Sequence, residues 1–100
     1  MGRAELTIPT HQLEVFCRRH HIRKLALFGS VWRDDFGPDS DVDVFVEFEP
    51  GHVPGLAFFD TEAELSHLIR RQVDLNTPQF LSQYFRDTIL AEAEVLYDAA

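Results

Sequence analysis

The stretch LALFGSVWRDDFGPDSDVDVFVEFEPG, residues 25–51, decides the fold of this 100-residue chain. A mostly apolar run over Lys24–Phe28, closed by a glycine, predicts a strand followed by a tight turn. Ser30 is a typical N-cap residue and predicts a short helix over Val31–Asp35. After a Gly-Pro-Asp break, apolar and polar residues alternate over Val42–Phe48 with the period of a half-buried strand. The stretch therefore predicts a strand, a turn, a short helix and a second strand.

Amphipathic helices are predicted on both sides of this stretch. Thr10 can cap a first helix whose apolar stripe repeats at steps of three and four residues. That stripe consists of Leu13, Phe16, Cys17 and His20. A second helix ends near Arg70 and Arg71, whose charges suit the negative end of the helix dipole. Its apolar stripe consists of Phe58, Leu65, Leu68 and Ile69.

The last third of the chain predicts one more strand and more helix. Val73 and Leu75 flank Asp74 in a short strand, and Thr77 with Pro78 marks the start of another helical stretch. A final helical stripe consists of Phe85, Ile89, Ala93 and Leu96. The order of elements predicts the α+β class, with a small mixed β-sheet and helices packed on it.

Length and composition limit the possible classes of protein. One hundred residues fit a single domain over residues 1–100. The apolar runs are far shorter than the ~20 residues that a bilayer span needs, and Arg3, Glu5 and Pro9 interrupt any secretory signal. Cys17 is the only cysteine, which excludes an intrachain disulfide and a cysteine-based zinc site. We expect a cytoplasmic protein that neither spans nor binds a membrane.

The charge is negative and unevenly distributed. The formal net charge is −8, which argues against direct binding to the phosphate backbone of nucleic acid. Residues 34–64 contain ten acidic residues and no Lys or Arg. A smaller basic cluster, Arg18, Arg19, Arg23 and Lys24, is typical of a solvated surface. The acidic centre predicts bound cations or a basic partner.

Three aspartates stand out in the predicted strands. Asp41 and Asp43 are two residues apart, so in a strand they project from the same face while Val42 and Val44 face the core. By itself, such a pair most often only indicates a strand face exposed to solvent. Asp74 points away from its apolar neighbours, and the three carboxylates converge if its strand lies beside the second one. Repulsion among them then calls for a divalent cation or for raised pKa values, and Mg²⁺ is the natural cation because it takes oxygen ligands.

The Gly29-Ser30 pair follows the first predicted strand, where a phosphate could bind. Glycine allows the backbone to approach a ligand closely, and the N-terminus of a following helix presents free N–H groups. A Gly-Ser pair alone usually only punctuates a turn. Together with the aspartates it forms a stronger signal than either part.

These residues resemble the signature of the polymerase-β-type nucleotidyltransferase superfamily. The signature consists of Gly29-Ser30, ten intervening residues, Asp41-Val42-Asp43, and Asp74 on a later strand. The segments LALFGSVWRDDFGPDSDVDVFVEFEPG, RRQVDL and LSQYFRDTILAEAEVLY are similar to minimal nucleotidyltransferases, the MNT antitoxins that act beside HEPN-domain toxins. The resemblance covers nearly the whole chain.

The resemblance implies a polymerase-β-like fold and a specific set of site residues. Nucleotide binding falls to Gly29, Ser30, Arg33 and Ser40, and both metal binding and catalysis to Asp41, Asp43 and Asp74. ATP would be the substrate and Mg²⁺ the cofactor. Asp74 would also activate the attacking hydroxyl. The chain departs from many relatives at Trp32-Arg33-Asp34, where they carry small residues beside the arginine.

The resemblance implies that the chain transfers AMP to a tyrosine hydroxyl of a HEPN ribonuclease toxin and forms a hetero-oligomer with it. Two other functions use the same residues. One is an antitoxin that covers the toxin without chemistry, and the other is a transferase acting on a small molecule. The second needs a further substrate-binding region, for which 100 residues leave little room. The five histidines show no spacing that gathers three zinc ligands, and we interpret them as structural.

Overall fold

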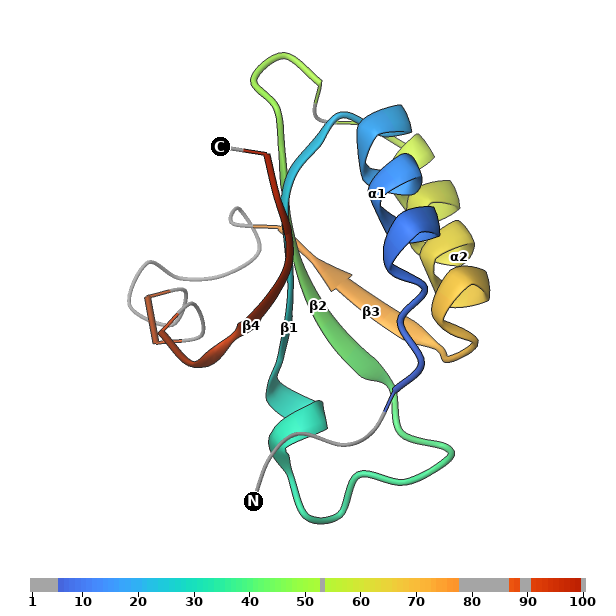
Figure 1. The fold of residues 1–100 in the computed structure, drawn as a ribbon, viewed down its shortest axis with the longest axis vertical. Coiled ribbons are helices and arrows are strands. Elements are labelled where there is room, and N and C mark those ends of the chain that lie inside the picture. Colours follow the sequence, from blue (N-terminus) through green and yellow to red (C-terminus); the bar gives the residue numbers. More distant parts are fainter. Residues whose placement is uncertain (1–5, 53, 78–86, 89–90, 100) are drawn as a thin grey trace.

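In the computed structural model, residues 6–52, 54–77, 87–88 and 91–99 are described. Their strands form one sheet in the order β3-β2-β1-β4 (Figure 1). These strands are β1 (Ile22–Phe28), β2 (Val42–Phe48), β3 (Val73–Asn76) and β4 (Glu94–Asp98). Because β1 is antiparallel to β2 and β4 while β2 is parallel to β3, the sheet is mixed. This confirms the predicted α+β class.

Two helices cover one face of this sheet (Figure 1). They are α1 (Thr10–Arg19) and α2 (Ala57–Ile69). The core between helices and sheet takes the alternate residues of each strand, because side chains two apart share a face. In β2, Val42, Val44 and Val46 are all fully buried in this core. The residues between them, including Asp43, therefore face away from the helices.

The first helix begins differently from the prediction. Thr10 is already the first helical residue, and Pro9 occupies the N-cap position without any side-chain capping bond. The Pro9 carbonyl accepts a hydrogen bond from the Leu13 N–H at 2.8 Å, so it opens the i→i+4 ladder. The hydroxyl of Thr10 therefore does not cap the helix. The fixed φ of proline suits this entry, because it is close to the helical value.

The turn after β1 also differs in detail from the prediction. The expected helix over residues 31–35 is a single 3₁₀ turn, η1 (Gly29–Trp32), with Phe28 at its N-cap position. Ser30 therefore lies inside the turn and does not cap it. The turn ends at Arg33, whose backbone is extended.

The prediction of a C-terminal helix is wrong at its last residues. Leu96 lies in β4, which pairs antiparallel with β1, and Ala93 directly precedes that strand. Leu96 and Tyr97 pack against the main core. As a strand, this segment forms hydrogen bonds with the backbone groups at the open edge of β1, which a helix here would leave without partners. Tertiary context therefore overrides the local helical pattern. Phe85 and Ile89 lie outside the described residues, and in the helical stretch expected from Pro78 onward the described residues 87–88 and 91–92 are helical.

Among the described residues, no helix is long and apolar enough to cross a membrane.

Candidate active site

Gly29 forms a tight turn at the end of β1, and two constraints require glycine there. Its φ is +63°, in the left-handed region that L side chains rarely adopt. A Cβ at this position would lie 2.6 Å from the Asp43 Oδ2 atom. The backbone at Gly29 thus passes directly against a carboxylate of the predicted site. A larger residue would displace either the turn or that carboxylate.

Ser30 ties this turn to the aspartates of the next strand. The Ser30 N–H donates to Asp43 Oδ2 at 2.9 Å, and the Ser30 hydroxyl donates to the Asp41 carbonyl at 2.6 Å. The Asp43 N–H donates in turn to the Ser30 hydroxyl at 3.3 Å. Ser30 is buried, so these bonds are shielded from water. Its side chain therefore fixes the backbone that carries both aspartates, while its role in nucleotide binding stays a prediction.

The strand order brings Asp43 and Asp74 side by side. In the parallel pairing of β2 with β3, Asp43 is the direct partner of Asp74, and neighbouring strands lie about 4.8 Å apart. Both side chains project from the face opposite the helices, because Val44 and Leu75 fill the core beside them. Asp41 lies one residue before β2 and is exposed. The condition that the Asp74 strand lies beside the second strand is met.

The electrostatics of Asp74 reflect this crowding. Burial raises the pKa of the Asp74 carboxyl, and the nearby charges of Asp43, Glu62 and Asp41 raise it further. A raised pKa means that the ionised form is disfavoured among like charges. A divalent cation would reverse that penalty by neutralising the carboxylates. Aspartate oxygens are the type of ligand that Mg²⁺ takes, although the three carboxylates are not gathered within 4.8 Å of one another in this structure.

Glu62 is a site residue that the sequence did not reveal. It belongs to α2, where its Oε2 atom accepts a hydrogen bond at 2.8 Å from the Leu75 N–H in β3. Its charge contributes to the raised pKa of Asp74. No spacing pattern links Glu62 to the aspartates, because the contact depends on how α2 packs on the sheet edge.

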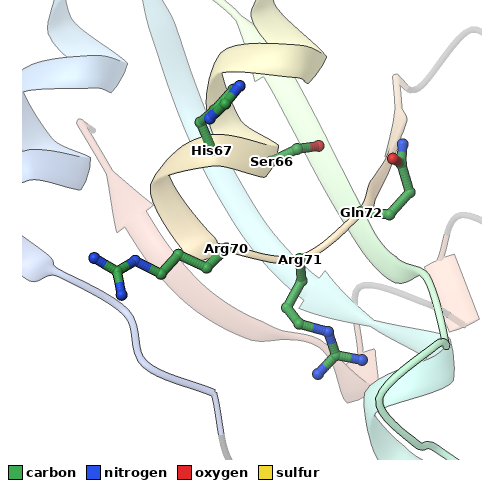
Figure 2. A pocket seen from close by; sticks show the side chains of 5 residues that line it. All are labelled: Ser66, His67, Arg70, Arg71 and Gln72. Atoms are coloured by element: carbon green, nitrogen blue, oxygen red, sulfur yellow. The ribbon is translucent and has the colours of Figure 1, made fainter.

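The loop before Asp41 is held by Arg71. Its Nη2 atom donates to the Gly37 carbonyl at 2.6 Å and to the Ser40 carbonyl at 3.0 Å. Its guanidinium lies 4.6 Å from the centroid of the Phe36 ring. Figure 2 shows Arg71 among the residues that line a pocket at the end of α2, where its side chain diverges from that of Arg70. Arg71 thus anchors the segment that leads into the site.

Ser40 and Arg33, the other two residues predicted to bind the nucleotide, differ in their surroundings. The Ser40 hydroxyl accepts a bond from the Gly37 N–H at 2.9 Å, and the Ser40 N–H donates to the Gly37 carbonyl at 3.1 Å. Ser40 therefore closes the loop just before Asp41. Arg33 is exposed, and its Nε atom lies 3.6 Å from Asp35 Oδ1. The described contacts of Arg33 do not join it to the aspartates.

A small mixed sheet with a glycine turn beside paired strand aspartates is the arrangement of a nucleotidyltransferase. The family described as "Polymerase beta, Nucleotidyltransferase" matches residues 11–100, and the chain belongs to this family. It is 34% identical over 89 residues to protein adenylyltransferase MntA of Thermococcus cleftensis. The aligned region covers 88% of this chain and 87% of that relative.

Solved structures show the same fold. One chain of a toxin–antitoxin crystal structure with AMP-PNP aligns with a TM-score of 0.70 and 17% identity, over 91% of this chain and 74% of that one. A chain from the complex of a tri-AMPylated Shewanella oneidensis HEPN toxin with its MNT antitoxin aligns with a TM-score of 0.64 and 18% identity. That match covers 89% of this chain and 69% of the other. The predicted resemblance to minimal nucleotidyltransferases is confirmed.

Proposed function

We propose that this chain is an antitoxin that transfers AMP from ATP to a tyrosine hydroxyl of a HEPN ribonuclease toxin. The observation that carries the proposal is the direct pairing of Asp43 with Asp74, beside a turn in which only glycine fits. Similarity to a protein adenylyltransferase over most of both chains supports transfer to a protein. The structural likeness to chains of toxin–antitoxin complexes supports the choice of partner.

The chemistry follows from the residues of the site. The tyrosine oxygen attacks the α-phosphorus of ATP and forms a new P–O bond, while the bond from that phosphorus to the bridging oxygen breaks and pyrophosphate leaves. The Asp74 carboxylate accepts the hydroxyl proton as general base. Mg²⁺ held by Asp41, Asp43 and Asp74 would stabilise charge on the attacking and leaving oxygens.

The other residues of the site position these groups. The glycine at position 29 lets the backbone approach the phosphates, and the bonds of Ser30 keep Asp43 at its place beside the turn. Arg71 and Ser40 hold the loop that leads into Asp41. Arg33 is exposed, and its solvent-exposed contact with Asp35 can be exchanged for one with a triphosphate. A folded toxin would bring its own surface to the acceptor side of the site.

The test is to co-express the chain with a HEPN toxin and to measure the toxin's mass and ribonuclease activity. We expect a toxin that is heavier by adenylyl units and stays inactive after this chain is removed. Asp43→Asn should abolish the mass increase, and Asp74→Asn should slow it by about 10²–10⁴-fold while affecting ATP affinity less. Asp60→Asn, at an exposed acid of α2, is the matched control and should leave transfer unchanged.

Two results would overturn the proposal. An unmodified toxin that regains ribonuclease activity once separated would show neutralisation by binding alone. Transfer at an unchanged rate in Asp43→Asn would remove the metal-site assignment. Labelled ATP and excess Mg²⁺ must be present in both measurements, so that neither substrate nor cation limits the result.

A further inference from the structure

A second cluster of possible metal ligands lies at the opposite end of the sheet. His21 directly precedes β1, and Glu49 and His52 follow β2. One ligand atom from each residue can be chosen so that all three lie within 4.8 Å of one another. Asp43 is six residues before Glu49 along a strand, so the two ends are separated by about 20 Å. The cluster is thus distinct from the aspartates.

The backbone holds these three residues in a fixed relation. The Glu49 N–H donates to the His21 carbonyl at 2.8 Å, and the His52 N–H donates to the Glu49 carbonyl at 3.0 Å. His21 has a φ of +56°, which is uncommon for a residue other than glycine. A backbone conformation of this kind persists where neighbouring contacts impose it, and the hydrogen bond from the Glu49 N–H to the His21 carbonyl is such a contact.

The side chains also converge. The rings of His21 and His52 stack with centroids 4.0 Å apart and planes inclined by 15°. The His21 Nδ1 atom lies 3.6 Å from Glu49 Oε1. Two imidazoles and one carboxylate thus share one exposed corner, where water can reach a fourth coordination position. The sequence spacing did not indicate this cluster, because His21 is distant from the other two along the chain.

We propose that His21, Glu49 and His52 form a binding site for a divalent transition-metal cation, with Zn²⁺ as the first choice. Two imidazole nitrogens and one carboxylate oxygen are a ligand set that zinc accepts, with water in the fourth position of a tetrahedron. Bonds of about 2.0–2.1 Å place tetrahedral ligand atoms about 3.3 Å apart, so the stacked rings must rotate apart and the carboxylate must move inward to share one ion. Mg²⁺ would find only one carboxylate here, and it prefers oxygen ligands.

The site would add a second link between two segments that already share the hydrogen bond from the Glu49 N–H to the His21 carbonyl. His21 lies in the turn between α1 and β1, while Glu49 and His52 lie in the loop between β2 and α2. A bound cation would link both segments and stabilise the folded chain, because the unfolded chain does not hold the three ligands together.

The experiment is a calorimetric titration of Zn²⁺ into the full chain, in excess Mg²⁺ to occupy the aspartate oxygens. We expect one high-affinity Zn²⁺ per chain, and a rise in Tm when it is added. His21→Asn, Glu49→Gln and His52→Asn should each weaken binding by at least the 10–100-fold that loss of an outer-shell partner costs. Asparagine is chosen at His21 because it tolerates positive φ.

Control variants keep the test decisive. His11→Asn and His67→Asn remove other histidines and should leave Zn²⁺ affinity unchanged. Histidine ring NMR signals should shift for His21 and His52 on adding Zn²⁺, and not for His11 or His67. Equal affinity in all five variants, or loss of Zn²⁺ binding in Asp43→Asn instead, would overturn the proposal and leave the cluster a surface ion pair.

Discussion

At the scale of single residues, Gly29 matters most for the site, because it meets both a backbone and a steric requirement. The sequence could predict a turn at a Gly-Ser pair after a strand. It could not predict that the space of a Cβ is occupied by Asp43 Oδ2, because that contact links residues 14 positions apart. The positive φ and the close carboxylate are therefore known only from the fold.

Replacing Gly29 by alanine should damage both stability and transfer. A left-handed φ costs a non-glycine residue about 1–2 kcal/mol, and the added Cβ would also push against the Asp43 carboxylate. Urea unfolding and AMP transfer to the toxin measure the two effects. Gly37→Ala is the matched control, since a Cβ there meets nothing within 4 Å and its φ is not positive. Equal effects of the two substitutions would contradict this account.

Cys17 makes the stability of the fold sensitive to high pH. Its side chain is fully buried, and burial raises the pKa of the thiol from 9.0 to about 12. The folded chain therefore keeps the proton through the range in which the unfolded chain loses it. The contribution of this thiol to stability is fully present below pH 9.0 and is lost as the pH rises toward 12.

The expected slope is up to about 1.4 kcal/mol of unfolding free energy per pH unit above pH 9. Urea unfolding of the wild type and of Cys17→Ala at several pH values from 7 to 10.5 measures it. Because the lysines and tyrosines titrate in both proteins, the difference between the two curves isolates Cys17. Parallel curves would show that the buried thiol has no such role.

At the scale of elements, the prediction succeeded where the signal was local. The alternation over Val42–Phe48 fixed β2 correctly, and the end of α2 near Arg70 was also correct. The sequence could not predict that Asp43 pairs with Asp74, because this requires β3 to lie beside β2, and the order of strands in the sheet is not a local property. Glu62 and the anchoring of the loop by Arg71 had no sequence signal, since both are contacts between elements that are distant in sequence.

The strand β4 shows why local periodicity can mislead. The stripe that includes Leu96 fits a helix, yet residues 94–98 complete the sheet against β1. Aromatic and β-branched residues favour a strand there, and the open edge of β1 supplies the hydrogen bonds. The packing of Leu96 against the core, beside a more exposed Val95, distinguishes a strand from a helix experimentally.

Leu96→Ala should therefore destabilise the fold more than Val95→Ala. Val95 is 48% exposed, so its truncation should cost well under 1 kcal/mol, whereas the half-buried Leu96 should cost about 1–2 kcal/mol. Chemical denaturation of the two variants measures the difference. A larger loss at Val95 would mean that β4 presents the opposite face to the core.

At the scale of the whole molecule, acidic charge is concentrated where the proposed chemistry takes place. The net charge is −8, and ten of the acidic residues fall within residues 34–64. The folded chain brings Asp74 and Glu62 close to the aspartates before and within β2, so like charges oppose the compact state. Composition predicts an acidic centre that binds cations or a basic partner, and the fold shows that Asp43, Glu62 and Asp41 lie near Asp74 in it.

Mg²⁺ should therefore stabilise the chain beyond any effect of ionic strength. A cation that binds only the folded state adds about 2.7 kcal/mol at 100 times its Kd, and EDTA should reverse the gain. Thermal unfolding in MgCl₂ and in NaCl of equal ionic strength separates binding from screening. Asp43→Asn should lose the excess stabilisation by Mg²⁺ and should be more stable than the wild type without it, while Asp60→Asn should retain the excess. Equal Tm values in the two salts would argue that the carboxylates repel one another without holding a cation, and the chemistry assigned to them would then lose its physical basis.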